Sequence, residues 1–203
     1  MATVLPRLAI DLSAPSPAAV SALFSDEPER VCFEIGFGGG EHLVHDAQRD
    51  PDAGFIGVEP FIAGMAKAVS AVDALGLANV RFYDDDAALL LDWLPPASLD
   101  RVDLLYPDPW PKKRHWKRRF VGAENLARVA RVLKSGGMFR FASDIESYVA
   151  WTLAHLAADA RFAWEAERVA DWREPFPGWP GTRYEAKALR QGRIPTYLAF
   201  RRL

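Results

Sequence analysis

Short apolar runs alternate with helix-like segments through most of this chain. The runs have the length and composition of buried strands and cover residues 30–36, 54–58, 79–83, 100–106 and 138–142. Helices are expected between or after them, over residues 40–49, 61–75, 87–93, 120–133 and 146–159. A strand that reaches the next through a helix pairs with it in parallel, by a right-handed crossover. The alternation therefore predicts an α/β protein with a three-layer αβα sandwich.

The end of the chain departs from this alternation. Residues 162–169 and 196–201 have strand-like composition and are separated by a long segment that looks irregular, which suggests a final hairpin at the sheet edge. We therefore expect a mostly parallel seven-stranded sheet with an antiparallel edge strand. The length of 203 residues fits one domain over residues 1–203. Within it, residues 1–29 are expected to form an N-terminal helical segment, with a short helix after Pro17.

A glycine-rich turn follows the first predicted strand, in the order Glu34-Ile-Gly36-Phe-Gly38-Gly-Gly. Glycine at such a turn lets the backbone take positive φ and approach a ligand closely. The dinucleotide fingerprint G-x-G-x-x-G would need glycine at position 41, where this chain has Glu41. An acid there would also repel a pyrophosphate, which binds at the positive end of a helix. An NAD-dependent oxidoreductase is therefore the least favoured enzyme class.

Carboxylates recur at the ends of three successive predicted strands, as Glu34, Glu59 and Asp86. In the place of Glu59, a carboxylate can accept hydrogen bonds from both hydroxyls of a ribose. S-adenosylmethionine carries a sulfonium and an ammonium but no phosphate, so a cleft lined by these acids suits it better than NAD. Each signal alone is ambiguous, because glycine-rich turns are common and residues 84–86 could form a solvated turn or a helix cap. Together the signals favour a methyltransferase.

Residues 107–119 read Pro-Asp-Pro-Trp-Pro-Lys-Lys-Arg-His-Trp-Lys-Arg-Arg. The prolines keep the residues before them out of the helical region, so Asp108 is predicted on a stiff, extended turn after a buried strand. The six Lys and Arg residues, with His115 and Trp116 among them, suit a phosphate backbone and a stacking surface. Because the net charge is −2, such cations must be concentrated on one face. A solvated basic start to the next helix would explain the cations but not Pro-Asp-Pro-Trp.

Several classes of site and location are not indicated. No apolar run reaches the roughly 18 residues of a membrane span, and no signal-peptide pattern is present, so a cytoplasmic protein without a membrane partner is expected. Cys32, the one cysteine, is expected to be a buried small hydrophobe. His42, His45 and His155 are expected on helix surfaces, and no metal is expected. The oligomeric state, monomer or homodimer, stays open.

Together these motifs resemble those of bacterial tRNA (guanine-N7-)-methyltransferases, which have the Rossmann-like class I S-adenosylmethionine-dependent methyltransferase fold. The resemblance extends from about Val31 to Leu203, and the 107–119 motif is its most specific part. The matching motifs are Glu-Ile-Gly-Phe-Gly at 34–38, Gly-Val-Glu-Pro at 57–60, the whole of 107–119, Ser-Asp-Ile-Glu-Ser-Tyr at 143–148 and Thr-Arg-Tyr-Glu at 182–185. Family members usually begin with a longer, Arg-rich arm, which Met1–Leu12 lacks.

The resemblance implies methyl transfer from S-adenosylmethionine to N7 of a guanine in tRNA, at position 46 in the variable loop, with Asp108 as the catalytic residue. Residue by residue, it implies cofactor contacts at Glu34, Gly36, Gly38, Glu59, Asp86 and Asp108. It implies substrate contacts at Lys112, Asp144, Thr182, Arg183, Tyr184 and Glu185. It implies RNA contacts at Arg114, His115, Trp116, Lys117, Arg118 and Arg119.

The chemistry of such a reaction assigns expected roles to a few side chains. Guanine N7 has a lone pair and no proton, so it can attack the donor methyl carbon without a base. Asp108 is expected to stabilise the positive charge that moves onto the purine. Asp144 and Glu185 are candidate acceptors for the guanine N1–H and exocyclic amine. A flipped base needs a stacking surface, and the candidates for it are Trp110, Trp116 and Tyr184.

Competing explanations remain for several of these residues and for the function. Trp110 could pack the turn, Asp144 could cap the following helix, and Tyr184 could be edge-strand packing. The late arginines Arg183, Arg190 and Arg193 could be solvated rather than bound to RNA phosphates. Two other functions compete: a class I methyltransferase for another RNA or a small heterocycle, and a non-catalytic RNA-binding scaffold with the same fold.

Overall fold

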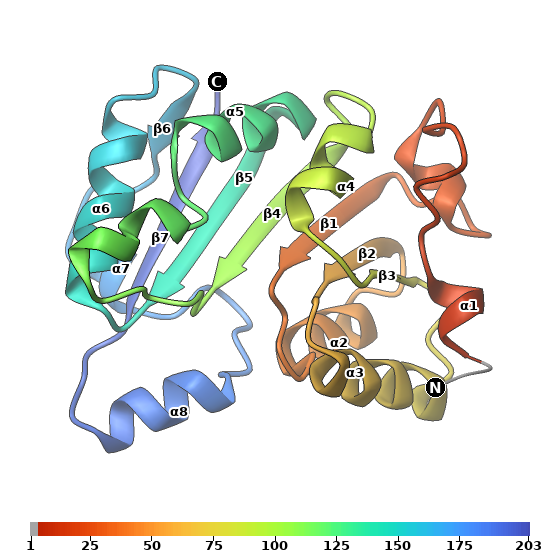
Figure 1. Cartoon of the computed structure of the whole chain (residues 1–203), viewed down its shortest axis with the longest axis horizontal. Helices are drawn as coiled ribbons and strands as arrows, with labels where there is room; N and C mark the ends of the chain where they lie inside the picture. Colours follow the sequence, from red (N-terminus) through yellow and green to blue (C-terminus); the bar gives the residue numbers. More distant parts are fainter. Residues whose placement is uncertain (1–3) are drawn as a thin grey trace.

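The computed structural model describes residues 4–203, so the first three residues of the predicted N-terminal segment lie outside it. In this described part of the chain, seven strands form one sheet in the order β3-β2-β1-β4-β5-β7-β6 (Figure 1). The strands are β1 (Arg30–Ile35), β2 (Ala53–Val58), β3 (Val80–Tyr83), β4 (Leu99–Leu105), β5 (Leu133–Ser143), β6 (Phe162–Trp164) and β7 (Thr196–Arg202). The first five pair in parallel, whereas β7 runs antiparallel to both β5 and β6.

Helices cover both faces of the sheet. The α-helices are α1 (Leu5–Leu8), α2 (Glu41–Arg49), α3 (Ile62–Leu75), α4 (Ala87–Trp93), α5 (Ala123–Val132), α6 (Glu146–Ala157), α7 (Ala170–Arg173) and α8 (Arg183–Arg190). Residues 4–203 also contain two 3₁₀ helices, η1 (Val20–Leu23) and η2 (Lys113–Arg118). Within residues 4–203, no helix has both the length and the hydrophobicity required to cross a bilayer.

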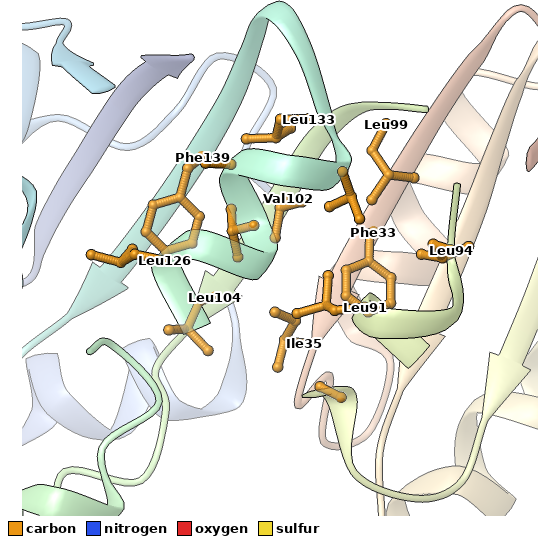
Figure 2. Packing of buried hydrophobic residues seen from close by; sticks show 14 of the residues in the cluster. Phe33, Ile35, Leu91, Leu94, Leu99, Val102, Leu104, Leu126, Leu133 and Phe139 are labelled. Atoms are coloured by element: carbon orange, nitrogen blue, oxygen red, sulfur yellow. The ribbon is translucent and has the colours of Figure 1, made fainter. Parts of the chain in front are cut away.

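The buried side chains divide into two main layers because strand residues alternate between the faces of a sheet. On β1, Phe33 and Ile35 join the core beneath α4, α5 and α6, while Cys32 joins the core beneath α2 and α3. Figure 2 shows the first layer, in which Phe33 and Ile35 lie with Leu91 and Leu104. The three-layer αβα sandwich is confirmed, and so is the burial of Cys32.

The predicted elements differ from the structure mainly near the end of the chain. Residues 162–169 form a strand only as far as Trp164, and the segment expected to be irregular contains α7 and α8. Strand β5 begins at Leu133, where a helix end was expected, because Leu133 pairs with Leu99 ahead of a bulge. The antiparallel strand β7 lies one place inside the edge, which β6 occupies.

The order of the strands reverses between β1 and β4. These two strands are neighbours in the sheet although β2 and β3 lie between them in the sequence. Connections from the two strands leave toward opposite sides, and open α/β sheets bind ligands in the crevice formed at such a point. The arrowheads of β1, β4 and β5 point toward the side of the molecule where α8 lies (Figure 1).

Candidate active site

A cleft of about 580 Å³ opens at the carboxyl ends of β1, β2 and β4. This volume is typical of sites for small ligands, and the cleft lies where the strand order reverses. Its lining combines the backbone of the glycine-rich turn, carboxylates and aromatic rings. The lining residues that matter most are Gly36, Gly38, Glu59, Asp86, Asp108, Trp110, Tyr148 and Tyr184.

Glu59 holds the glycine-rich turn in place beside the cleft. Its side chain is only 4% exposed, Oε2 accepts a hydrogen bond from Gly38 N at 2.7 Å, and Oε1 accepts one from Phe61 N at 3.0 Å. Gly38 has a φ of +60°, which glycine adopts without strain. Helix α3 approaches so closely that a Cβ at Gly64 would lie 2.2 Å from the Gly38 carbonyl oxygen. These contacts set the shape of one end of the cleft.

Two more carboxylates lie at the cleft margin. Asp86 caps α4, since its Oδ1 accepts a hydrogen bond from Ala88 N at 2.9 Å. Asp108 is exposed on the turn after β4. Contrary to the prediction, this turn is not extended throughout: Tyr106 and Trp110 have φ values of +50° and +43°. A left-handed conformation costs a non-glycine residue about 1–2 kcal/mol, so the surrounding contacts must hold it.

Glu34 is not among the residues that line the cleft, unlike Glu59 and Asp86, with which it was predicted to be grouped. On β1 its side chain faces α2, where Oε2 lies 2.7 Å from Nδ1 of His42. His42 was expected on a helix surface but is only 3% exposed. Its ring packs on Trp179, with the ring centroids 4.9 Å apart. Glu34 and His42 therefore form a buried pair on the face of the sheet covered by α2.

A buried ion network extends from His42. Arg140 Nη2 lies 3.3 Å from His42 Nε2, and Arg140 and Arg101 both bind Asp103, at 2.6 and 2.8 Å. Burial opposes the charge of Asp103, but the two guanidinium groups outweigh it and hold its pKa far below the ordinary value. Arg101 also pairs with Asp46. His42, Asp46 and Asp103 are close enough to bind one metal ion, but the arginines already neutralise the carboxylates.

We expect His42 to make stability depend on pH. Burial alone would lower its pKa, but Glu34, Asp103 and Asp46 raise it above the ordinary value of 6.5. A raised folded-state pKa adds stability below the unfolded pKa, and this is lost as pH rises through the folded value. We therefore compare the free energy of unfolding of the wild type with that of His42→Gln. The wild type should exceed the variant by more at about pH 6 than at about pH 9. Urea denaturation at both pH values measures this, and a difference that grows with pH would contradict it.

The predicted substrate residues around Tyr184 begin helix α8 rather than an edge strand. Thr182 caps this helix, since its Oγ1 accepts a hydrogen bond from Glu185 N at 3.1 Å. Tyr184 lines the cleft, so edge-strand packing is the wrong explanation for it. The Glu185 carboxylate is buried and accepts hydrogen bonds from Trp179 Nε1 at 2.8 Å and from Tyr197 OH. Glu185 thus anchors the start of α8.

Two further substrate candidates are engaged in contacts of their own. Asp144 forms an ion pair with Arg193 and does not cap α6, so the capping explanation is wrong. The Arg183 guanidinium lies 4.8 Å from the centroid of the Tyr184 ring and donates a hydrogen bond to its hydroxyl at 2.9 Å. The ion pair therefore links the end of β5 to the segment between α8 and β7, whereas the Arg183–Tyr184 contact is local to the start of α8.

Residues 112–118 form a cationic ledge beside the cleft, most of it in η2. Its exposed cations are Lys112, Lys113, Arg114, Lys117 and Arg118. The Arg118 guanidinium lies 4.9 Å from the centroid of the Trp110 ring, and the His115 ring meets the same indole edge-on at 6.1 Å. Trp110 therefore both packs this turn and lines the cleft. Trp116 is half-buried and packs against Trp151 at 5.6 Å.

Arg119 lies differently from the cations of the ledge. It is only 4% exposed and donates hydrogen bonds to the carbonyl oxygens of Pro109 at 3.0 Å and Ser147 at 2.8 Å. Its guanidinium stacks on Trp116 at 4.4 Å. This inward placement contradicts the prediction that Arg119 contacts RNA. A run of like charges in the sequence does not show which member turns inward.

The aromatic lining residues that were not predicted from the sequence include Phe61, Tyr106 and Tyr148. Phe61 follows the Glu59-Pro60 pair and is 70% exposed, which is unusual for phenylalanine. Its place two residues after Glu59, a predicted site residue, was the available signal. Tyr148 lies in the 143–148 motif, where no role had been assigned to it.

Comparisons with known proteins identify the family. Residues 28–197 match a family described as putative methyltransferase. A tRNA (guanine-N(7)-)-methyltransferase of Rhizobium meliloti is 61% identical over 199 residues, which cover 98% of this chain and 86% of that protein. The protein of the same name from Mesorhizobium japonicum is 63% identical over 191 residues, covering 94% of this chain and 82% of that one.

Solved structures share the fold. The 16S rRNA methyltransferase KamB matches with a TM-score of 0.66 at 20% identity, covering 94% of this chain and 95% of that chain. A putative methyltransferase from Streptococcus mutans, solved in complex with SAH, matches with a TM-score of 0.56 at 11% identity, over 87% of this chain and 90% of that chain. The relatives decide the family, because their identity is high over nearly the whole chain. The chain belongs to the tRNA (guanine-N7-)-methyltransferase family.

Proposed function

We propose that this protein transfers a methyl group from S-adenosylmethionine to N7 of a guanine in tRNA, forming 7-methylguanosine. The place of Asp108 carries the proposal, because it lies between an acidic cleft and a ledge of exposed cations. The cleft suits a cationic methyl donor and the ledge suits a polyanion. Family membership supports the same reaction. We also propose a single domain over residues 1–203, since all seven strands join one sheet.

The donor half of the cleft is bordered by Gly36, Gly38, Glu59 and Asp86. S-adenosylmethionine, when bound, supplies an electrophilic methyl group on a sulfonium centre. The lining fits such a molecule: the carboxylates attract its positive charges and accept hydrogen bonds from its hydroxyls. The glycine backbone leaves room for close approach. Glu34 is left out of this set, because it is paired with His42.

Asp108 acts electrostatically. Guanine N7 needs no deprotonation, so the protein has to align nucleophile, methyl carbon and sulfur with the reacting atoms about 3–3.5 Å apart. Positive charge then passes to the purine, where a fixed carboxylate stabilises it. The rings of Trp110, Tyr148 and Tyr184 border the same cleft and offer stacking surfaces for a flipped base.

The other substrate candidates shape the guanine pocket in this proposal. Asp144 and Glu185 already have protein partners, so we assign them to holding the late segment in place rather than to a free acceptor role. Thr182 caps the helix that presents Arg183 and Tyr184. Lys112 is exposed at the start of the ledge and is assigned to the RNA.

Removing ledge cations should weaken tRNA binding through electrostatics. For the double variant Lys113→Ala and Lys117→Ala, we expect the slope of log Kd against log salt concentration to fall by about two, one for each phosphate left without its cation. Filter binding or fluorescence anisotropy across a salt series measures the slope. As a control, Lys134→Ala removes a cation that pairs with Asp100 instead, and should leave the slope unchanged. Equal slopes for wild type and the double variant would remove the ledge from the RNA interface.

The direct test is mass analysis of tRNA incubated with the protein and isotope-labelled S-adenosylmethionine. We expect label in 7-methylguanosine, and digestion fragments should place it at position 46. Label in a different nucleoside would show that the enzyme methylates an atom other than guanine N7. Unmodified tRNA, with donor binding intact by calorimetry, would favour a different substrate or a non-catalytic role.

A further inference from the structure

We propose that Arg119 is a positioning residue that fastens the turn carrying Asp108 to helix α6. The inference rests on the proposed function, because it takes Asp108 as the group that stabilises the transferred charge. It also divides the basic residues of 112–119 into two roles. Arg119, the last cation of that run, acts on the protein itself, while the exposed cations before it face solvent.

The hydrogen bonds of Arg119 connect two parts of the site. Its Nε donates to the carbonyl oxygen of Pro109, the residue directly after Asp108, at 3.0 Å. Its terminal nitrogens donate to the carbonyl oxygen of Ser147 at 2.8 Å and to the Ser147 hydroxyl at 3.0 Å. Pro109 lies on the turn after β4, and Ser147 lies in the first turn of α6. One planar group therefore joins the turn to the helix that follows the neighbouring strand.

Three aromatic rings pack around the Arg119 guanidinium. It lies 4.4 Å from the ring centroid of Trp116, 4.7 Å from that of Tyr148 and 5.6 Å from that of Trp151. Such contacts stabilise a desolvated cation. Tyr148 itself lines the cleft, so Arg119 contacts the site on two sides: through the backbone beside Asp108 and through this ring.

The turn needs such a constraint. Tyr106 and Trp110, on either side of Asp108, both hold left-handed backbone conformations. Strained conformations of this kind persist only where surrounding contacts over-determine them. The bond from Arg119 to Pro109 ties down the backbone between these two residues and so supplies one of those contacts. Lysine could keep the charge there but not the three-way hydrogen bonding, because an ammonium lacks the planar fork of a guanidinium.

The first experiment separates positioning from RNA contact. For Arg119→Lys, we expect kcat at saturating donor and tRNA to fall on the order of 10- to 100-fold, since small misplacements of a catalytic group are this costly. The Kd for tRNA and its salt slope should stay within about twofold of wild type, because the side chain does not face the RNA. In Lys117→Ala, which removes an exposed neighbour, we expect the main change in the salt slope instead, which should fall by about one.

A second measurement reports on the turn without using activity. Hydrogen exchange followed by mass spectrometry should show faster exchange of the Tyr106 amide, which donates to the carbonyl oxygen of Ala142, and of the amides in residues 110–118 in Arg119→Lys than in wild type. Calorimetric titration with S-adenosylmethionine counts the folded sites, so that kcat is expressed per competent molecule. Arg119→Gln, which keeps a planar donor group, should fall between wild type and Arg119→Lys in both measurements.

The outcomes distinguish this inference from the proposed function. A wild-type protein that forms no 7-methylguanosine would defeat the proposed function, while the exchange data would still decide whether Arg119 holds the turn. An active wild type with unchanged kcat and unchanged exchange in Arg119→Lys would defeat the positioning role. A reduced salt slope in Arg119→Lys with kcat intact would make Arg119 an RNA contact after all.

Discussion

Asp108→Asn is expected to lower kcat by about 100-fold or more, the cost typical of removing one preorganised electrostatic contact to a transition state. The substitution keeps the shape of the side chain and removes its charge. The carboxylate lies at the cleft margin, and in the proposed mechanism it stabilises the positive charge that passes to the purine with the methyl group. We expect the Kd for tRNA to change little, because the exposed cations of the ledge remain. Rates of 7-methylguanosine formation at saturating donor and tRNA give the measurement.

A matched control is Asp84→Asn. Asp84 is an exposed acid on the segment after β3, two residues before Asp86, and it carries the same formal charge. Its substitution tests whether loss of any nearby negative charge is enough, and we expect kcat within about twofold of wild type. Equal rates for Asp108→Asn and the wild-type protein, with tRNA saturating in both, would remove Asp108 from the chemistry.

Gly64→Ala is expected to weaken binding of S-adenosylmethionine by about 10-fold or more, which corresponds to about 1.4 kcal/mol. A Cβ at this position would lie 2.2 Å from the Gly38 carbonyl oxygen, so the glycine-rich turn must move away from α3. That movement strains the bond from Gly38 N to Glu59, which shapes the donor half of the cleft. Titration calorimetry with the donor measures the effect.

The sign of the stability change makes the Gly64 test sharper. Alanine inside a helix usually stabilises it by about 0.5–1 kcal/mol relative to glycine. Here we expect a loss of about 1–3 kcal/mol instead, because the methyl group meets backbone that cannot rotate away. Gly122→Ala is the control: its Cβ would meet nothing within 4 Å, so donor affinity should not change, and stability should fall by less than about 1 kcal/mol because Gly122 is the N-cap of α5. A stabilised Gly64→Ala variant with normal donor affinity would show that the contact is loose.

Much of the fold was predictable because the local signals agreed. The helix predicted at 87–93 matches α4. Helix α3 ends at Leu75, as predicted, and Gly76 after it takes the left-handed conformation of a helix C-cap. The prediction of an irregular segment between β6 and β7 was wrong for a physical reason. Helix α8 has only eight residues, most of them polar, and it follows a stretch rich in proline and glycine, so its composition resembled that of a loop although the helix is amphipathic.

The site was predictable where a backbone feature fixed it. Gly38, Glu59 and Asp108 follow strands whose carboxyl ends meet at one edge of the sheet, so their sequence positions placed them correctly around the cleft. Glu34 and Arg119 could not be placed this way. Their orientation depends on partners such as His42 and Ser147, and residue type alone does not reveal such a partner.

The packing of His42 against Trp179 joins α2, which follows the glycine-rich turn, to the segment that leads into helix α8. Trp179 also donates to Glu185, so the contact continues into the start of that helix. Chimaeras made with relatives of different tRNA preference should therefore exchange the stretch between β6 and β7 together with position 42. A graft that transfers only His42 or only Trp179 would pack that ring against a side chain of a different size and shape, and the contact between α2 and the segment before α8 would be lost.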